Sequence, residues 1–224
     1  MSYTVDPTAI LCKEAQINCS SVGKKTVVGD FSRIKGSFIG DYCSIDRQNF
    51  VLNSKLDDYT YTGPWNMIFE CSIGKYCSIS YGVTIGPPEH NYKLLSTHPF
   101  IYRSKYDFFD DNETIQQQRF EKKLDIGNDV WIGCNSVIAR GISVGDGAVI
   151  GANSFVNKNI PPYAIAVGSP AKVIKYRFNE EVIDILKDIK WWNLPPEKIK
   201  QCKKYFLQEI NEQLLNELKQ ELTQ

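Results

Sequence analysis

Two histidines are the first candidates for chemistry in this chain of 224 residues, which holds only His90 and His98. An imidazole of ordinary pKa, about 6.5, is neutral at pH 7 and can accept a proton from a hydroxyl group. His90 follows Gly86-Pro87-Pro88-Glu89, and its spacing fits either a general base or a loop histidine bonded to the backbone. Glu89 or a backbone carbonyl could orient its second ring nitrogen. His98 lies in the turn Ser96-Thr97-His98-Pro99-Phe100, where a structural role is the more common one.

The seven cysteines could supply nucleophiles or metal ligands, but their arrangement favours neither a metal site nor a disulfide framework. Their number is odd, and they are scattered without Cys-x-x-Cys pairs. This usage is typical of reduced thiols in a cytoplasmic protein. The first residues carry no basic segment followed by an apolar run, so we expect no secretory signal.

Composition indicates a folded domain with a balanced charge. The chain has 26 basic and 26 acidic residues, and 42% of its residues are hydrophobic. A net charge of zero gives no electrostatic reason to expect nucleic acid or an anionic membrane as the main partner. No run of about 18 uncharged apolar residues occurs, so we expect no membrane span.

A six-residue repeat organises most of the chain. Aliphatic residues recur at six-residue steps, a glycine often follows them, and a small or β-branched residue stands four positions later. The aliphatic positions are Val5, Leu11, Ile17, Val22, Val28, Ile34, Ile39, Ile45, Ile73, Ile79, Ile85, Ile126, Ile132, Ile138, Val144, Ile150 and Val156. Because six is even, these residues fall on one side of a strand, and glycine allows the corner that follows. The pattern predicts short strands in a coil whose turns stack to bury their apolar side.

Two segments depart from the repeat, and we predict excursion loops at residues 46–72 and 86–123. Long insertions in a compact repeat are usually functional. Beyond the repeat, apolar residues at three- and four-residue steps predict an amphipathic helix over 178–192 and a second over 195–222. An ordinary β-sandwich is the alternative fold, but sandwiches do not repeat glycine at a fixed phase.

Four stretches of the sequence resemble a known family. They are Ile73-Gly74-Lys75-Tyr76-Cys77-Ser78-Ile79, His90 to Phe100, Asp129-Val130-Trp131-Ile132-Gly133, and Gly141 to Ile174. They resemble the hexapeptide-repeat acyltransferases, and more closely the xenobiotic acetyltransferase branch, which includes streptogramin, chloramphenicol and sugar O-acetyltransferases. The resemblance implies an all-β fold, a left-handed parallel β-helix over residues 1–177, followed by a C-terminal helical extension over residues 178–224. It also implies a homotrimer with active sites at the subunit interfaces.

The resemblance further implies acetyl transfer from acetyl-CoA to a hydroxyl group, without a metal. His90 stands where the family has its general base. The residues expected along the pantetheine arm are Trp131, Gly133, Cys134, Gly151 and Ala152, and those expected toward the phosphates are Asn157, Lys158, Lys172 and Lys175. A cysteine nucleophile is the competing mechanism. Cys43 and Cys77 occupy small-residue positions typical of core packing, and no base stands beside Cys134, so direct transfer is favoured.

Three function classes compete. A zinc enzyme of the carbonic anhydrase type on this fold needs three histidines per site, whereas a symmetric trimer of this chain supplies two per site at most. A non-catalytic β-helix scaffold predicts neither a special histidine nor excursion loops. For an acetyltransferase we expect a small-molecule acceptor, a saccharide first and an antibiotic such as a streptogramin or chloramphenicol second. Aromatic and acidic residues of the two predicted loops suit sugar rings, among them Asp57, Tyr59, Tyr61, Trp65, Tyr92, Tyr102, Tyr106 and Phe108.

Overall fold

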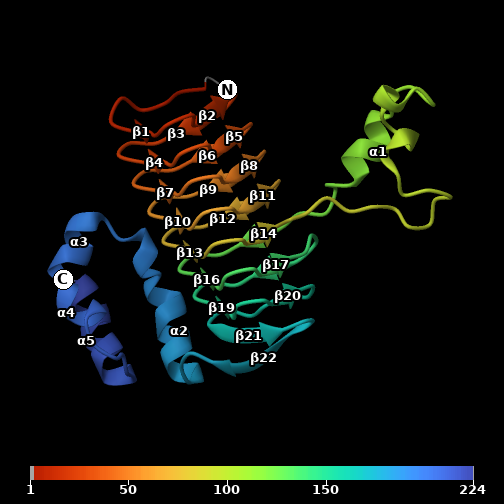
Figure 1. Ribbon diagram of the computed structural model, residues 1–224. Helices are drawn as coiled ribbons and strands as arrows, with labels where there is room; N and C mark the ends of the chain where they lie inside the picture. Colours follow the sequence, from red (N-terminus) through yellow and green to blue (C-terminus); the bar gives the residue numbers. More distant parts are fainter. Residues whose placement is uncertain (1–2, 224) are drawn as a thin grey trace. The chain divides into compact units, whose positions relative to one another are not determined.

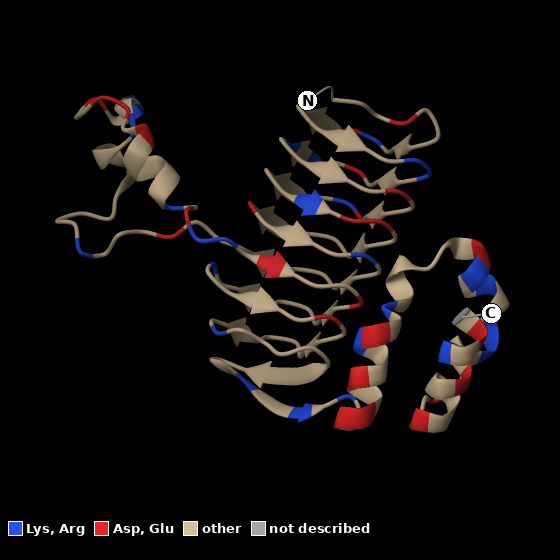
Figure 2. Ribbon diagram, turned by 180° about the vertical axis from the view of Figure 1, so that it is seen from behind, with Lys and Arg blue, Asp and Glu red and all other residues tan. Residues whose placement is uncertain are grey.

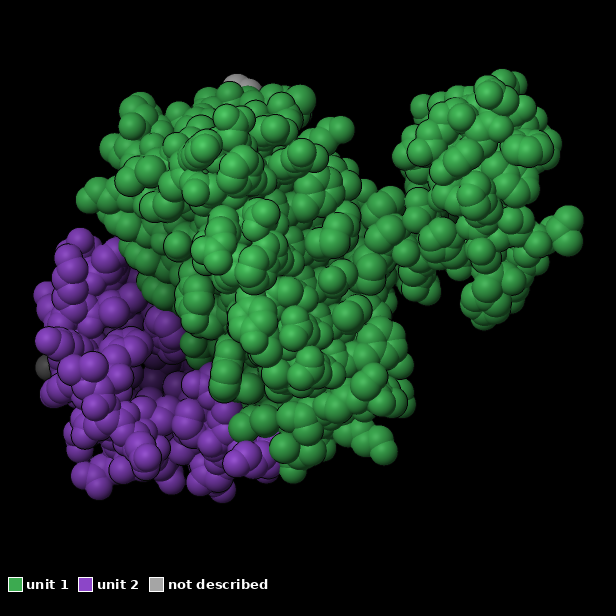
Figure 3. Space-filling model, viewed as in Figure 1, with its two compact units in different colours: residues 1–174 green, residues 175–224 purple. Residues whose placement is uncertain are grey.

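The computed structural model describes residues 3–223, which form two compact units that meet between Ile174 and Lys175 (Figure 3). The first unit is the left-handed parallel β-helix that the sequence predicts, with short strands stacked turn upon turn (Figure 1). In Figure 2, acidic and basic residues are interspersed over this unit. Within residues 3–223, no helix has the length and apolar character needed to cross a membrane.

The strands of the coil form three sheets of nine, seven and six strands. The nine-stranded sheet holds β1 (Ile10–Leu11), β4 (Val27–Val28), β7 (Ser44–Ile45), β10 (Tyr61–Thr62), β13 (Ser78–Ile79), β16 (Trp131–Ile132), β19 (Val149–Ile150), β21 (Ala164–Gly168) and β22 (Ala171–Tyr176). The seven-stranded sheet holds β2 (Gln16–Asn18), β5 (Arg33–Lys35), β8 (Phe50–Leu52), β11 (Met67–Phe69), β14 (Thr84–Ile85), β17 (Val137–Ile138) and β20 (Phe155–Val156). The six-stranded sheet holds β3 (Ser21–Val22), β6 (Phe38–Ile39), β9 (Lys55–Leu56), β12 (Ser72–Ile73), β15 (Asp125–Ile126) and β18 (Ser143–Val144).

Columns of aliphatic side chains fill the interior of the coil. In the seven-stranded sheet, Val51 pairs with Ile68, Ile68 with Ile85, and Ile85 with Ile138, and all four side chains are fully buried. Burying each such side chain contributes about 1.5–3 kcal/mol relative to leaving it in water. Because every turn adds one residue to each column, the repeat itself builds the core.

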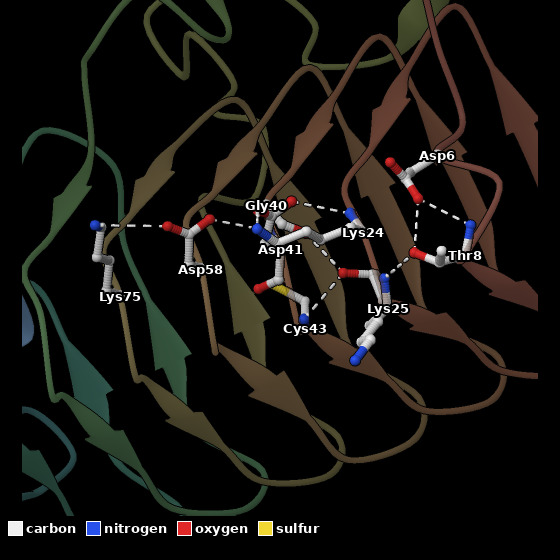
Figure 4. Close-up of polar contacts among 10 residues, drawn as sticks. Asp6, Thr8, Lys24, Lys25, Gly40, Asp41, Cys43, Asp58 and Lys75 are labelled. Atoms are coloured by element: carbon white, nitrogen blue, oxygen red, sulfur yellow. Dashed lines mark hydrogen bonds and ion pairs between the residues drawn. The ribbon is translucent and has the colours of Figure 1, made fainter. Parts of the chain in front are cut away.

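Polar side chains fasten the corners between turns (Figure 4). The Asp41 carboxylate accepts the Lys24 backbone N–H at 2.9 Å, and the Asp58 carboxylate accepts that of Asp41 at 2.9 Å. Asp58 also forms an ion pair with Lys75 at 3.5 Å. A Cβ at Gly40 would lie 2.6 Å from the Asp58 carboxylate oxygen, so only glycine leaves room for this contact. Gly23, Gly74 and Gly127 likewise leave room for a side-chain oxygen of the next turn, those of Asp41, Asn128 and Asp146 respectively.

The predicted excursion at residues 46–72 is wrong, because the coil continues through it as β8 to β12. The aliphatic column runs on with Thr62 in an aliphatic position, paired with Ile45 and Ile79. Buried asparagines replace the small residues, and Asn49 Oδ1 accepts the Asn66 backbone N–H at 2.9 Å. The turns are therefore regular in three dimensions, although polar residues at the repeat positions hide the pattern in the sequence. The aromatic residues here belong to the coil, as with Tyr59, which stacks between Tyr42 and Tyr76 at centroid distances of 5.0 and 4.7 Å.

One long excursion leaves the coil after β14 and returns at β15 (Figure 1). It contains the short 3₁₀ helices η1 (Pro99–Ile101) and η2 (Ser104–Tyr106) and the helix α1 (Glu113–Gln118). Gly86 begins it with a φ of +65°, and a Cβ there would lie 2.5 Å from the Phe69 carbonyl oxygen. Glycine is required at this exit for both reasons.

The second unit is helical. It holds α2 (Glu180–Ile189), η3 (Trp191–Asn193), α3 (Pro196–Gln201), α4 (Lys203–Phe206) and α5 (Glu212–Thr223). The single helix predicted over 195–222 is therefore wrong: the chain breaks at Cys202 and again over residues 207–211. Asn211 begins α5, because its side-chain oxygen accepts the Leu214 N–H at 2.9 Å, and asparagine favours the start of a helix. Lys219 of α5 pairs with Asp188 of α2 at 2.9 Å.

Two neighbouring threonines provide a test of the core. Thr62 Oγ1 is buried and has no hydrogen-bond partner among the described residues, so Thr62→Val should stabilise the fold by about 1 kcal/mol, because a methyl group replaces an unsatisfied hydroxyl. Thr60→Val is the matched control. Thr60 Oγ1 donates to the Gly74 carbonyl at 2.7 Å and accepts the Cys77 N–H at 3.0 Å, so its loss should destabilise by about 1–3 kcal/mol. Melting curves of both variants measure the difference, and equal shifts would contradict this description of the column.

Candidate active site

His90 lies near the start of the excursion, and two contacts fix its ring. Its Nδ1 is 2.9 Å from the Thr97 carbonyl oxygen, and its Nε2 is 3.3 Å from Arg119 Nη2. A carbonyl oxygen only accepts hydrogen bonds and a guanidinium only donates them. Both contacts are therefore satisfied by one tautomer, with the proton on Nδ1 and a lone pair on Nε2. This is the tautomer that can accept a proton from a substrate.

Arg119, near the end of the excursion, is itself held by the backbone of Glu89, near its start. Its Nε donates to the Glu89 carbonyl at 3.0 Å, and the Glu89 N–H donates to the Arg119 carbonyl at 3.0 Å. The Glu89 carboxylate pairs with Lys122 at 2.9 Å. Of the two groups that the sequence offers for orienting His90, the backbone carbonyl of Thr97 makes the contact, whereas the Glu89 carboxylate is bound to Lys122.

Two hollows meet at His90, one of about 580 Å³ and one of about 410 Å³. His90, Tyr102 and Arg119 line both. Most residues around the larger hollow are polar, and all residues of both hollows lie within 89–122. Tyr102 is 2% exposed, and its hydroxyl has no hydrogen-bond partner within the described chain. The arrangement can bind a polar molecule whose hydroxyl group approaches Nε2.

His98 has the structural role that its turn predicts. Its Nδ1 accepts the Phe100 N–H at 3.2 Å and thereby caps η1. Its ring packs edge-on against Tyr106 at a centroid distance of 4.9 Å. Because Nδ1 uses its lone pair to accept the Phe100 N–H, the neutral ring carries its proton on Nε2, and His98 offers no free lone pair to a substrate hydroxyl.

The residues predicted to hold the pantetheine arm lie together on adjoining turns of the coil. Trp131 is in β16 and 56% exposed, and Gly133 and Cys134 follow that strand. Gly151 and Ala152 follow β19, the next strand of the same sheet. A Cβ at Gly133 would lie 2.5 Å from the Ala152 backbone nitrogen, so glycine allows these two turns to approach closely.

The residues predicted for the phosphate end are exposed but more scattered. Asn157 and Lys158 follow β20, at the same corner as Gly86 two turns away, because Ile85, Ile138 and Val156 are in register. Lys172 lies in β22, and Lys175 belongs to the second unit. Among the described residues none of these three lysines has a carboxylate partner, so each is available to an anion.

His90 and the coil residues occupy separate parts of one chain. Neither hollow at His90 includes any of the residues predicted to bind coenzyme A. The predicted base lies on the excursion and the residues predicted to bind coenzyme A lie on the coil, and neither hollow at His90 in a single copy is lined by both sets. In residues 3–223 no cluster of three His, Cys, Asp or Glu side chains is placed to hold a metal ion.

The buried thiols are unsuited to nucleophilic attack. Burial raises the pKa of Cys43, Cys71 and Cys77 to about 12, so all three stay protonated at neutral pH. Cys134 is half-buried and close to Tyr81, whose pKa is raised by its hydrogen bond to this thiol. The structure thus gives the cysteine alternative no activated thiolate in the core.

The sequence did not single out Arg119, which contacts His90, or Arg140, which lies where the excursion returns to the coil. Tyr102 was among the aromatic residues expected to suit a sugar ring, and it lines both hollows. Arg119 had no signal beyond its place in the excursion. Arg140 had one, since it is a charged residue inside an otherwise regular stretch of the repeat, between Ile138 and Ile142. It is 5% exposed and touches both the coil and the returning excursion.

Comparison with known proteins gives consistent results for sequence and fold. Residues 125–158 match the family model described as bacterial transferase hexapeptide (six repeats). The chain is 44% identical over 178 residues to a chloramphenicol acetyltransferase of Morganella morganii. The matched region covers 77% of this chain and 78% of that protein. It is 45% identical over 131 residues to a galactoside O-acetyltransferase of Escherichia coli, covering 57% of this chain and 51% of that protein.

A solved structure has the same fold at low sequence identity. It is an N-acyltransferase of Bacillus cereus in complex with dTDP-4-amino-4,6-dideoxyglucose and coenzyme A. The TM-score is 0.58 and the identity 19%, over 77% of this chain and 91% of that one. At this identity the likeness establishes the fold alone.

Thiol labelling at pH 8 tests the description of the cysteines. Exposed Cys19 should react with Ellman's reagent first, and half-buried Cys12 and Cys134 should follow more slowly. Cys43, Cys71 and Cys77 should react only after unfolding, because their thiols are buried and protonated. Mass spectrometry of the labelled peptides identifies the sites. Rapid labelling of Cys77 in the folded protein would contradict the burial and the raised pKa.

Proposed function

Because the chain belongs to the hexapeptide-repeat acetyltransferases and is thus an enzyme that transfers acyl groups, we propose that it moves an acetyl group from acetyl-CoA to a hydroxyl group of a saccharide. The observation that carries this proposal is the geometry of His90. Its Nδ1 donates to the Thr97 carbonyl, its Nε2 carries the lone pair that contacts Arg119, and the residue lines both hollows. An imidazole held in this way is prepared to act as a general base.

The proton follows a short route. His90 Nε2 takes the proton of the acceptor hydroxyl as its oxygen bonds to the carbonyl carbon, and then returns that proton to the departing sulfur. Bound acetyl-CoA supplies the thioester for this exchange. The Thr97 carbonyl holds the ring throughout and stabilises the imidazolium that forms between the two steps, because its oxygen accepts the Nδ1–H in both states.

Arg119 has a defined place in this proposal. Its Nη2 occupies the position at Nε2 that the acceptor hydroxyl must take, so acceptor binding displaces this one contact. The guanidinium remains anchored through Nε to the Glu89 carbonyl. A guanidinium held beside the reacting hydroxyl can donate to the acceptor or to the oxyanion of the tetrahedral stage.

The coil residues fit the binding of coenzyme A. Trp131 offers an exposed apolar face, and Gly133 and Gly151 keep the adjoining turns free of side chains. Cys134 and Ala152 lie beside them. Lys158 and Lys172, which have no carboxylate partner in the described chain, provide positive charge for phosphates, and Asn157 provides hydrogen-bond donors.

A homotrimer accounts for the separation of base and groove within one chain. In this arrangement the excursion of one copy brings His90 to the coil of its neighbour, and three equivalent sites form at the interfaces. The support is that both hollows at His90 are lined only by residues of the excursion. A site completed by a second copy also explains why neither hollow is deeply enclosed by a single chain.

A saccharide suits the polar lining of the larger hollow, where Asn91, Ser96 and Gln118 can exchange hydrogen bonds with hydroxyl groups. The galactoside O-acetyltransferase relative is in line with this choice. Acetylation of an antibiotic is the second candidate, favoured by the 44% identity to a chloramphenicol acetyltransferase over most of its length. A scaffold without catalysis is excluded by membership of an acetyltransferase family.

Replacement of His90 tests the mechanism. His90→Ala should lower kcat by about 10²–10⁴-fold, the usual loss for a general base, while acetyl-CoA binding is retained. Thiol release with a panel of sugars and nucleotide sugars measures kcat, and calorimetry measures binding. His98→Asn is the control, because asparagine can also cap η1 and should leave kcat near the unmodified value. Near-normal turnover in His90→Ala would end the assignment.

A further inference from the structure

Arg140 is a buried cation with an unusual set of partners. It follows β17 in the coil, is 5% exposed, and has no carboxylate within ion-pair distance among the described residues. Its guanidinium instead faces backbone carbonyl oxygens. Nη2 donates to Phe69 at 2.9 Å, and Nη1 lies 3.0 Å from the Lys122 carbonyl and 3.2 Å from that of Phe120. The Glu70 carbonyl is 3.5 Å away.

These carbonyls come from two segments that are far apart in sequence. Phe69 and Glu70 end β11 in the coil, whereas Phe120 and Lys122 belong to the return of the excursion. The exit of the excursion also lies beside this side chain, because a Cβ at Gly86 would be 3.4 Å from Arg140 Nη2. One guanidinium therefore sits where the excursion leaves the coil and where it comes back.

From Arg140 a short series of contacts leads to His90. The Phe120 ring is close to two guanidinium groups, with Arg140 Cζ 5.0 Å and Arg119 Cζ 5.9 Å from its centroid. Arg119 then bonds the Glu89 carbonyl through Nε and reaches His90 Nε2 through Nη2. Arg140, Phe120, Arg119 and His90 thus form an unbroken chain of contacts from the coil to the candidate base.

This arrangement is costly, which argues against a role in packing alone. Burial lowers the pKa of Arg140, an effect that the charges of Glu70 and Glu89 offset only in part, and its Nε has no partner in the described chain. The other buried polar side chains of the described coil are neutral serines, threonines and asparagines, whose burial costs less than that of a cation. A forked donor is what can hold several carbonyls of two segments at once.

We propose that Arg140 is a positioning residue for catalysis: it binds the exit and the return of the excursion to the coil and thereby fixes the bonded pair of Glu89 and Arg119 beside His90. The inference rests on the proposed role of His90 as the base. Arg140 touches neither substrate nor His90, and it acts through Phe120, Arg119 and Glu89 on the placement of Nε2.

Kinetics of three variants provide the test. Arg140→Met keeps the length but removes every donor, and it should lower kcat by about 10²-fold, because a base displaced by about 1 Å loses that much, while KM for acetyl-CoA is unchanged. Arg140→Lys should lose less. Arg140→Ala should regain activity when millimolar guanidinium chloride is added, and sodium chloride at the same concentration should have no effect. Arg33→Met, at an exposed position of β5, is the matched control and should behave as the unmodified protein.

Hydrogen exchange separates this inference from the proposed function. In Arg140→Met, amides of residues 86–123 should exchange faster, while those of β15 to β20 keep their protection. Faster exchange throughout the coil, with a parallel fall in melting temperature, would overturn the inference by making Arg140 a residue of general stability. Unchanged exchange and unchanged kcat would also overturn it. If exchange is faster only in residues 86–123 of Arg140→Met, but the unmodified protein acetylates no acceptor, Arg140 does bind the excursion to the coil and the proposed function is wrong.

Discussion

Each turn of the coil buries its aliphatic side chains only by stacking on the next turn, and this constraint governs the rest of the protein. From β1 to β20 it requires strands of two or three residues, corners at regular intervals and parallel pairing between turns. The corners must be tight, so glycine leaves room for the carboxylate or amide that caps the neighbouring backbone. A scaffold of this kind is rigid and presents the same surface at every turn, which suits a long, narrow ligand such as a pantetheine arm.

The chemistry departs from this regularity at one place. Gly86 lets the chain leave the coil, and the segment up to Leu124 supplies the histidine, the arginine and the polar hollows that the repeat cannot provide. No residue between Gly86 and Lys123 belongs to the core cluster of the coil. The position of His90 must therefore be set where the excursion leaves the coil and where it returns. The paired backbone bonds of Glu89 and Arg119, the Glu89–Lys122 ion pair and the carbonyl contacts of Arg140 perform this task in our account.

The spacing of the aliphatic residues predicted the β-helix, because the residues that recur every six positions are the same ones that stack to form the core. Residues 46–72 were mispredicted as a loop since Thr62, Asn49 and Asn66 satisfy the geometry of the repeat with polar side chains, through contacts that only neighbouring turns reveal. The helix expected over 195–222 failed because Asn211 starts a new helix inside an unbroken apolar stripe. His90 was predicted from its type and place. Its Thr97 and Arg119 contacts were not, because they join residues whose proximity depends on the path of an irregular loop.

Subunit complementation tests the central claim, that His90 on the excursion serves a thioester held by the coil of a neighbouring copy. His90→Ala protomers keep the groove, and Ala152→Trp protomers keep the base but place a bulky ring on the exposed corner of the groove. Each variant alone should be nearly inactive. After unfolding and reassembly as an equal mixture, about one quarter of the sites in randomly mixed trimers combine an intact base with an intact groove, so about that share of activity should return. No recovery, with mixed trimers confirmed by mass, would contradict the account.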